Sequence, residues 1–191
     1  AVERGDGARE ACDVAIVAAG AWSAALLSGV GVPLPLETRA LQMLLTDAAP
    51  AALRPVVGAF EHRLSLKQLG GGGYLIGGGW PARVTEHAAN RYEVLDESVK
   101  GSLETARAVY SPLVGRVVAE RWAGLEAFTP DDVPVLGPVP GLGGLLIAAG
   151  FCGHGFALTP AVGDLLASLA TSRPVQVGSG LEFRHFAARM S

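Results

Sequence analysis

The stretch that decides the fold is Gly143–Leu169, GGLLIAAGFCGHGFALTPAVGDLLASL. It opens with the apolar run Leu145–Ala149, passes through a glycine-rich segment and ends in an amphipathic one. This order predicts a buried strand, a tight turn and a helix. We expect Thr159 to be the N-cap of that helix and Pro160 its first residue, because a hydroxyl can cap the first turn and proline has no N–H to lose there.

The predicted turn holds three glycines within six residues, Gly150, Gly153 and Gly155. Glycine adopts positive φ without strain and lets the backbone come into contact with a ligand. A helix that starts directly after such a turn offers unpaired N–H groups and the positive end of its dipole to a negatively charged group. Glycines before a helix also occur in plain turns, so the pattern alone leaves both interpretations open.

The residues of this turn resemble the flavin-contacting segment of the FAD-dependent amine and amino-acid oxidoreductases, the superfamily of glycine oxidase, sarcosine oxidase and D-hydroxyproline dehydrogenase. The matching residues are GFCGHGF, followed by Pro160 and Gly163. The resemblance implies FAD as the cofactor, and it assigns cofactor binding to Gly150, Gly153, His154, Gly155 and Phe156.

A second match lies near the N-terminus. The apolar strand expected over Asp13–Gly20 leads into a short helix, and its end resembles the family segment that passes beside the adenosine and pyrophosphate of FAD. The resemblance therefore adds Gly20, Ala21 and Trp22 to the cofactor-binding residues. Without the resemblance, the same residues describe an ordinary buried strand with its crossover helix.

A third match, RWAGLE over Arg121–Glu126, resembles the strand that crosses the substrate side of the flavin. Several family members carry arginine or tyrosine where this chain has Glu126. The resemblance implies a catalytic-site position for Glu126, where a carboxylate would favour an amine cation. It also makes His154 a candidate donor toward the flavin. The alternatives are that Glu126 lies on a solvated strand face and that His154 only braces the turn.

Composition excludes several classes of protein. Of 191 residues, 50% are hydrophobic and 17% charged, which indicates a globular chain with a sizeable core. The net charge of −3 and the lack of a basic cluster argue against a nucleic-acid partner. Apolar runs are too short to span a membrane. Two cysteines give neither a disulfide framework nor a metal-binding pattern, so we expect no metal and a reducing, cytoplasmic location.

The whole chain predicts an α+β fold. A mostly antiparallel substrate-domain sheet over residues 39–80 and 116–126 would be covered by the helix Val94–Leu113. Strands 13–19 and 144–149 would lie side by side, as the C-terminal strand–helix part of a Rossmann-like FAD-binding domain. We assign residues 11–31 and 129–191 to that domain, the latter with a tail that packs Phe183, Phe186 and Met190, and residues 32–128 to the substrate domain.

Two glycine runs receive separate interpretations. Gly70–Gly73 is predicted to form a hairpin loop, since no Lys-Ser/Thr and no helix follows it as a phosphate loop would require. Glycines 77–79, within a strand expected to run from Tyr74 to Trp80, indicate close approach of another backbone or of a ligand.

The first dinucleotide-binding unit is not found in the sequence. No G-x-G-x-x-G follows an N-terminal strand. The resemblance spans about residues 11–185 and only the C-terminal half of the family's chain. We therefore expect a domain fragment whose partner is the missing N-terminal FAD-binding half or a partner subunit. Alone, it should bind FAD weakly or not at all and be inactive.

The favoured hypothesis is the substrate-side and flavin-floor part of an oxidoreductase that oxidises a C–N bond of an amino acid, imino acid or secondary amine. A second is a non-catalytic remnant or subunit that does not bind FAD alone. A third is a cysteine hydrolase with Cys152 in a nucleophile elbow. The elbow needs a small residue where this chain has His154, which disfavours the third hypothesis.

Overall fold

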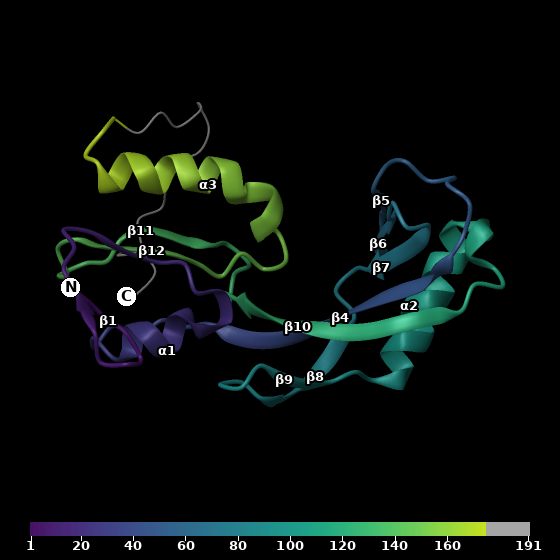
Figure 1. Ribbon diagram of the computed structural model, residues 1–191, viewed down its shortest axis with the longest axis horizontal. Coiled ribbons are helices and arrows are strands. Elements are labelled where there is room, and N and C mark those ends of the chain that lie inside the picture. The colour runs from purple at the N-terminus through teal and green to yellow at the C-terminus, as the bar shows by residue number, and fades with distance from the viewer. Residues whose placement is uncertain (175–191) are drawn as a thin grey trace. The chain divides into compact units, whose positions relative to one another are not determined.

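The computed structural model describes residues 1–174 of the chain (Figure 1). They fall into two compact units, one of Ala1–Glu37 with the chain from Ala127 onward, the other of Thr38–Glu126. The predicted α+β class is confirmed, with helices and a large, mostly antiparallel sheet. The packing expected of Phe183, Phe186 and Met190 concerns residues outside the described range.

The first unit is built on a three-stranded sheet in the order β11–β12–β3. Its strands are β3 (Ala15–Val17), β11 (Val135–Pro138) and β12 (Leu145–Ala149). β12 runs parallel to β3, with Leu145 opposite Ala15, and antiparallel to β11. The predicted neighbourhood of strands 13–19 and 144–149 is therefore confirmed.

Helical segments cover both faces of this small sheet (Figure 1). On one face, the 3-10 helix η1 (Gly20–Trp22) and α1 (Ser23–Ser28) lead to a core in which Leu27 packs with Ile147 and Val135. On the other, α3 (Gly155–Ala170) places Leu166 against Leu146 and Ala148 of β12. Alternate residues of β12 thus face opposite cores, as a strand between two helical layers requires. The exposed strands β1 (Val2–Glu3) and β2 (Arg9–Glu10) precede the sheet.

The second unit contains a seven-stranded sheet. Its core strands pair antiparallel in the order β5–β6–β7–β4, while β8 pairs with the start of β4 and with β9, and β10 also pairs with β4. The strand bounds are β4 (Glu37–Ala48), β5 (Val57–Ala59), β6 (His62–Gln68), β7 (Gly73–Gly77), β8 (Pro81–Glu86), β9 (Arg91–Glu93) and β10 (Val118–Phe128).

One face of this sheet is covered by α2 (Asp96–Val109), which 3-10 helix η2 (Ser111–Leu113) follows. Ala106 of α2 packs with Leu44, Leu66, Tyr74 and Ile76 of the strands. The helix predicted over 94–113 is therefore confirmed in kind and position.

The hairpin of β8 and β9 was not predicted from the sequence. Both strands are short and rich in charged residues, so their brief alternation, such as Ala82 and Val84 in β8, does not stand out as a strand pattern. In the fold, ion pairs join the two strands: Arg83 Nη1 lies 2.6 Å from Glu93 Oε2, and Arg91 Nη1 lies 3.0 Å from Glu86 Oε2.

The glycine runs behave largely as predicted. Residues Leu69–Gly72 form the loop between β6 and β7, closed by a hydrogen bond from Gly72 N to Leu69 O. Gly78 has φ +127°, and a Cβ there would lie 2.4 Å from the backbone of Arg63, which confirms close approach of another backbone. The strand predicted to reach Trp80 is too long, because β7 ends at Gly77. The next two residues, Gly78 and Gly79, both have positive φ and turn the chain.

The predicted start of α3 at Pro160 is wrong by more than one turn. The helix begins at Gly155, with His154 as its N-cap, and Pro160 lies inside it. Thr159 does not cap the helix; its hydroxyl donates to the carbonyl of Gly155 at 2.9 Å. The hydrogen bond from Leu158 N to His154 O begins the helix before Thr159. Because Pro160 has no N–H, the Phe156 carbonyl lacks its hydrogen bond within the helix.

Candidate functional site

The candidate site lies where the parallel strands β3 and β12 end. Because the two strands are parallel, their carboxyl ends meet at one edge of the sheet, and each leads into a segment singled out by the sequence. β3 leads to Gly20–Trp22, and β12 leads to Gly150–Phe156. In open α/β sheets, ligands bind in the crevice beyond the carboxyl ends of such strands. The fold thus brings both sequence-predicted cofactor segments to the same edge.

The turn after β12 is held in a left-handed conformation. Gly150, Cys152 and Gly153 have φ of +72°, +51° and +85°. The positive φ expected at Gly150 and Gly153 is confirmed. A Cβ at Gly150 would lie 2.5 Å from Cγ2 of Thr129, so this glycine is required both for its conformation and for its space. Thr129 and its neighbours in the chain support the turn, and sequence reasoning missed this role because the contact is long-range.

Gly155 differs from the other two glycines. It is the first residue of α3 and is absent from the positive-φ residues. A Cβ at this position would lie 3.2 Å from the Cβ of Phe151, which is tight contact but not a backbone clash. The positive φ that glycine permits in such a turn is therefore found at Gly150 and Gly153 but not at Gly155, because the helix begins there.

The start of α3 presents an anion-binding geometry. The first N–H groups of a helix have no partner within it, and they lie at the positive end of its dipole. His154 caps this helix through its backbone: its carbonyl accepts from Leu158 N at 3.3 Å, and no side-chain hydrogen bond caps the helix. His154 is itself exposed.

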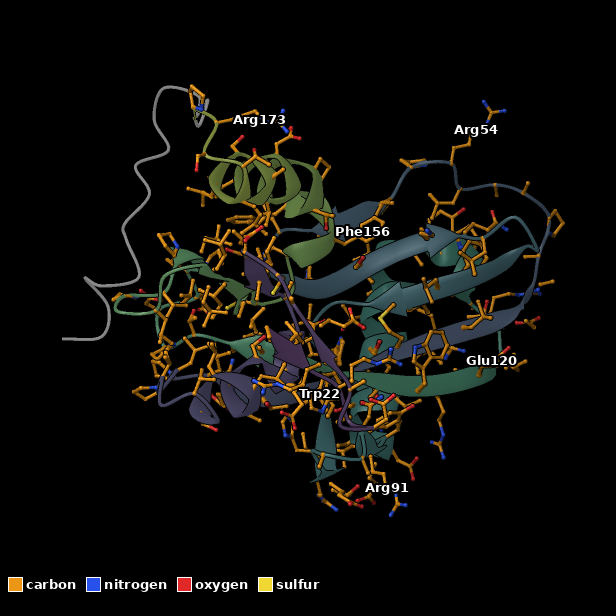
Figure 2. All side chains as sticks on the ribbon, turned by 60° about the vertical axis from the view of Figure 1, so that its left-hand side comes forward. Trp22, Arg54, Arg91, Glu120, Phe156 and Arg173 are labelled. Atoms are coloured by element: carbon orange, nitrogen blue, oxygen red, sulfur yellow. The ribbon has the colours of Figure 1, made fainter. Side chains whose placement is uncertain are left out.

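Phe156 follows directly and is 98% exposed. Figure 2 shows its side chain at the beginning of α3. The residues after it, up to Ala161, are exposed as well, although most of them are apolar. An apolar first turn on a helix whose later turns are packed is typical of a surface that contacts a ligand or another part of a protein.

The N-terminal segment is more enclosed. Gly20 has φ +54°, Ala21 is 3% exposed, and Trp22 is half-buried. Trp22 N donates to the carbonyl of Ala19 at 3.0 Å, which closes the turn. These three residues begin η1 directly after β3, so the backbone of Gly20, rather than a side chain, is placed at the edge of the sheet.

Glu126 and Cys152 are the remaining candidates. Glu126 is half-buried on β10, and it directly precedes Ala127, whose carbonyl accepts a hydrogen bond from Cys152 N at 3.3 Å.

Cys152 is 8% exposed. Its thiol donates to the Gly150 carbonyl at 3.1 Å and lies 3.6 Å from Oγ1 of Thr129. Neither contact is a base, so the geometry gives no support to a thiolate nucleophile.

Within residues 1–174, no group of three or more His, Cys, Asp or Glu side chains could hold a metal ion. No helix of the same residues is long and apolar enough to cross a membrane.

A parallel strand pair that ends in a left-handed glycine turn and an open helix start is an arrangement that can bind the anionic groups of a dinucleotide cofactor. Residues 1–169 match the family described as FAD dependent oxidoreductase (DAO), and the chain belongs to this family. FAD is the cofactor of the family.

Two curated relatives are glycine oxidases. That of Pseudomonas putida is 32% identical over 161 residues, and that of Pseudomonas aeruginosa is 33% identical over 162 residues; each alignment covers 84% of this chain and 42% of the relative. The hydrogen cyanide synthase subunit HcnC of Pseudomonas protegens is 30% identical over 83% of this chain. The chain therefore spans less than half the length of these relatives.

Solved structures share the fold. The iminodiacetate oxidase of Chelativorans sp. BNC1 superposes with a TM-score of 0.77 and 23% identity over 92% of this chain and 47% of its own. The glycine oxidase of Geobacillus kaustophilus superposes with a TM-score of 0.72 and 24% sequence identity. The match covers 89% of this chain and 44% of the glycine oxidase. The L-proline dehydrogenase of P. horikoshii superposes with a TM-score of 0.70 and 27% sequence identity. The match covers 83% of this chain and 42% of the dehydrogenase.

Proposed function

We propose that this chain is the substrate-side and flavin-floor part of an FAD-dependent enzyme that oxidises a C–N bond of an amino acid, an imino acid or a secondary amine. The observation that carries the proposal is the left-handed turn Gly150–His154, which leads directly into the open start of α3. Family membership and the glycine oxidase relatives support it.

The residues present fit a flavin. The turn keeps its backbone accessible at Gly153 and His154, which are exposed, and Phe156 offers an open aromatic side chain. In this proposal Gly150, Gly153, His154, Gly155 and Phe156 hold the flavin, and Gly20, Ala21 and Trp22 hold its adenosine end. When bound, FAD supplies the redox chemistry by accepting a hydride equivalent from the substrate.

The contribution of the chain is electrostatic. Backbone N–H groups at the start of α3 and the positive end of its dipole would stabilise negative charge, as the donors of an oxyanion hole do. His154 is proposed as a further donor. Glu126, half-buried on β10, is proposed to face the substrate and to favour its cationic amine.

We further propose that the full activity needs the N-terminal FAD-binding half that the relatives possess, or a partner subunit. In the described residues, β3 is the last strand of the order β11–β12–β3, so one of its edges pairs with nothing there. Ile16 on this strand is 44% exposed. An apolar edge strand is normally paired or covered in a folded protein, which supports a further strand beside β3.

Residues 38–126 form one compact unit, which we propose as the substrate domain, close to the 32–128 assigned from the sequence. The flanking segments, assigned as 11–31 and 129–191, would carry the flavin. A cytoplasmic location is also proposed; the two free cysteines, Cys12 and Cys152, agree with a reducing compartment.

Flavin content tests the proposal. We would purify the full-length protein that contains this chain and measure its absorbance in the flavin bands, in wild type and in Phe156→Ala. Phe60→Ala is the matched control, because Phe60 is 92% exposed but lies after β5 in the other unit. We expect flavin in the wild type and the control and a several-fold lower flavin content in Phe156→Ala.

Two results would contradict the proposal: no flavin in the wild type, or equal flavin in both phenylalanine variants. Residues 1–191 alone should bind FAD weakly, because the glycine loop that cradles the pyrophosphate in this class is absent from the sequence. Fluorescence quenching on titration with FAD measures this, and micromolar or tighter binding would show that this chain holds the main cradle.

A further inference from the structure

The loop after β4 and the hairpin loop between β6 and β7 border an open cavity that the proposed function does not use. Its volume is ≈ 450 Å³, which is within the usual range of sites for small molecules. Its lining comes from two short segments, within residues 49–54 and 68–72. Both segments belong to the unit Thr38–Glu126, so the cavity is formed by this unit alone.

The two loops that form the cavity are joined by hydrogen bonds. Ala49 N donates to the carbonyl of Gly72 at 3.1 Å. The Gln68 side chain adds a bridge, because its Oε1 accepts from Leu53 N at 3.0 Å and its Nε2 donates to the Gly72 carbonyl at 2.9 Å. A Cβ at Gly72 would lie 2.6 Å from the carbonyl oxygen of Ala49, so the loops pack without room for a side chain. A ligand would therefore meet walls that are already in place.

Part of the lining is apolar. Leu53 is half-buried and packs against the core beneath α2, so its position is fixed by the fold. Leu69, also half-buried, and the exposed Ala51 add two further apolar side chains. These side chains can cover a short apolar group of a ligand, and removing that group from water is favourable.

The backbone of the hairpin loop offers donors to the same cavity. Within residues 1–174, the N–H groups of Gly70 and Gly71 donate no hydrogen bond. The carbonyls beside them are already used, since Leu69 O accepts from Gly72 N and Gly72 O accepts from Ala49 N. A ligand that accepts hydrogen bonds therefore suits this loop better than one that donates them.

Arg54 alone carries a charge among the described residues that line the cavity. Its side chain extends away from the ribbon (Figure 2). Within the described range, 1–174, this side chain forms no ion pair or hydrogen bond. A free guanidinium can turn onto a carboxylate and bind it through two parallel hydrogen bonds. One cation balances one negative charge, so the cavity matches a monoanion better than a phosphate dianion.

We propose that this cavity binds a small organic monocarboxylate with a short apolar chain. Arg54 pairs with the carboxylate, the N–H groups of Gly70 and Gly71 donate to its oxygens, and the chain lies against the apolar side chains of the lining. The site is additional to the proposed flavin chemistry and does not rest on it. A bound carboxylate joins the two loops and so stabilises the folded unit.

The experiment uses hexanoate, hexanol and inorganic phosphate, which separate the charge of the ligand from its chain. Hexanol has the same chain length without the charge, and phosphate has charge without a chain. Binding of each to the full-length protein that contains this chain would be measured by isothermal titration calorimetry at low ionic strength.

Four variants locate the binding. Arg54→Met removes the charge, and Arg54→Lys keeps the charge but loses the two parallel donors. Ala51→Trp fills the apolar part of the cavity from an exposed position that tolerates a larger side chain. Arg91→Met is the matched control, because Arg91 is an exposed arginine of the same unit on β9, outside the cavity.

We expect hexanoate to bind, and hexanol and phosphate to bind at least several-fold more weakly. Arg54→Met should weaken hexanoate about fivefold or more, because it removes a charge-assisted pair of hydrogen bonds. Ala51→Trp should also weaken hexanoate, and Arg54→Lys should lie between wild type and Arg54→Met. Arg91→Met should bind hexanoate like the wild type.

Equal hexanoate binding in wild type and Arg54→Met would overturn the inference, since the anion would then bind elsewhere. An equal loss in Arg91→Met would also overturn it, because net charge alone would explain the effect. Phosphate binding tighter than hexanoate would contradict the carboxylate class. The flavin test is separate: hexanoate binding that depends on Arg54 in a protein without flavin would contradict the proposed function and leave this site standing.

Discussion

The backbone N–H of Cys152 donates to the carbonyl oxygen of Ala127 at 3.3 Å. This bond fastens the left-handed turn after β12 to the end of β10, two segments far apart in the sequence. Because Cys152 has φ +51°, its backbone conformation is one that few residues other than glycine, asparagine and aspartate adopt. The turn is therefore held by tertiary contacts and not by local preference.

Replacing Cys152 separates its thiol from its backbone. Cys152→Ser should keep stability and flavin content, because a hydroxyl can donate to the Gly150 carbonyl as the thiol does. Cys152→Val should lower the free energy of unfolding by roughly 1–3 kcal/mol, since a β-branched residue at positive φ is strained. Urea unfolding and flavin absorbance measure both. Loss of turnover in Cys152→Ser with the flavin retained would instead favour thiol chemistry.

Two glycines of the same unit should respond to alanine in opposite directions. Gly150→Ala should destabilise the protein by roughly 2–4 kcal/mol, because it adds strain at φ +72° and a clash with Thr129. Gly163→Ala should stabilise it by ~0.5–1 kcal/mol, because Gly163 lies inside α3 with open space around its Cβ position. Thermal unfolding compares the two. Equal shifts would show that the turn relaxes to accept a side chain.

The Gln68 side chain holds the loop after β4 to the hairpin loop. Its Oε1 accepts from the N–H groups of Ala52 and Leu53, and its Nε2 donates to the carbonyls of Ala49, Pro50 and Gly72. Gln68→Ala should lower the free energy of unfolding by roughly 2–4 kcal/mol.

Gln68→Glu is the informative companion of this variant. It keeps an acceptor for the two N–H groups but places a carboxylate against three carbonyl oxygens, so it should destabilise the protein as well. Urea unfolding would measure both variants, and a neutral effect of Gln68→Glu would show that the donated bonds contribute nothing.

Tyr74 gives the second unit a dependence on alkaline pH. Burial raises the pKa of its phenol above the usual value, and the hydrogen bond and charge of Tyr110 add to the shift. The unfolded chain therefore loses this proton at a lower pH than the folded chain. Stability is fully present below about pH 10 and falls as the pH rises above it. Urea unfolding between pH 8 and about 11 should show this fall in wild type and a smaller one in Tyr74→Phe; identical slopes would exclude Tyr74 as the cause.

Glu126 should control the charge of the substrate in the complete enzyme. Glu126→Gln should raise the KM for a cationic amine about tenfold or more, on the scale of one charge pair. Glu120→Gln is the control, because Glu120 is an exposed residue of the same strand (Figure 2). Steady-state kinetics would decide, and equal KM values in the two variants would place Glu126 on a solvated face.

The sequence by itself determined the class of fold and the place of the candidate site. Leu145–Ala149 is apolar and short, so it had to be a buried strand, and Gly150 and Gly153 marked the turn after it. The α2 helix followed from its period, and the hairpin from Gly70–Gly73. These features are local, since each depends on the conformational preferences of a few adjacent residues.

Only the tertiary structure decided the features that depend on distant partners. The helix α3 begins at Gly155 instead of the predicted Pro160, because the backbone of His154, in the preceding turn, caps the helix. The hairpin of β8 and β9 depends on the pairing of β8 with β4 and on the ion pairs between side chains of β8 and β9. Lys67 stands beside Leu75 and Leu45 only because three strands align in one register. Register and long-range hydrogen bonds join residues that no local pattern relates, and that is why the sequence alone left them open.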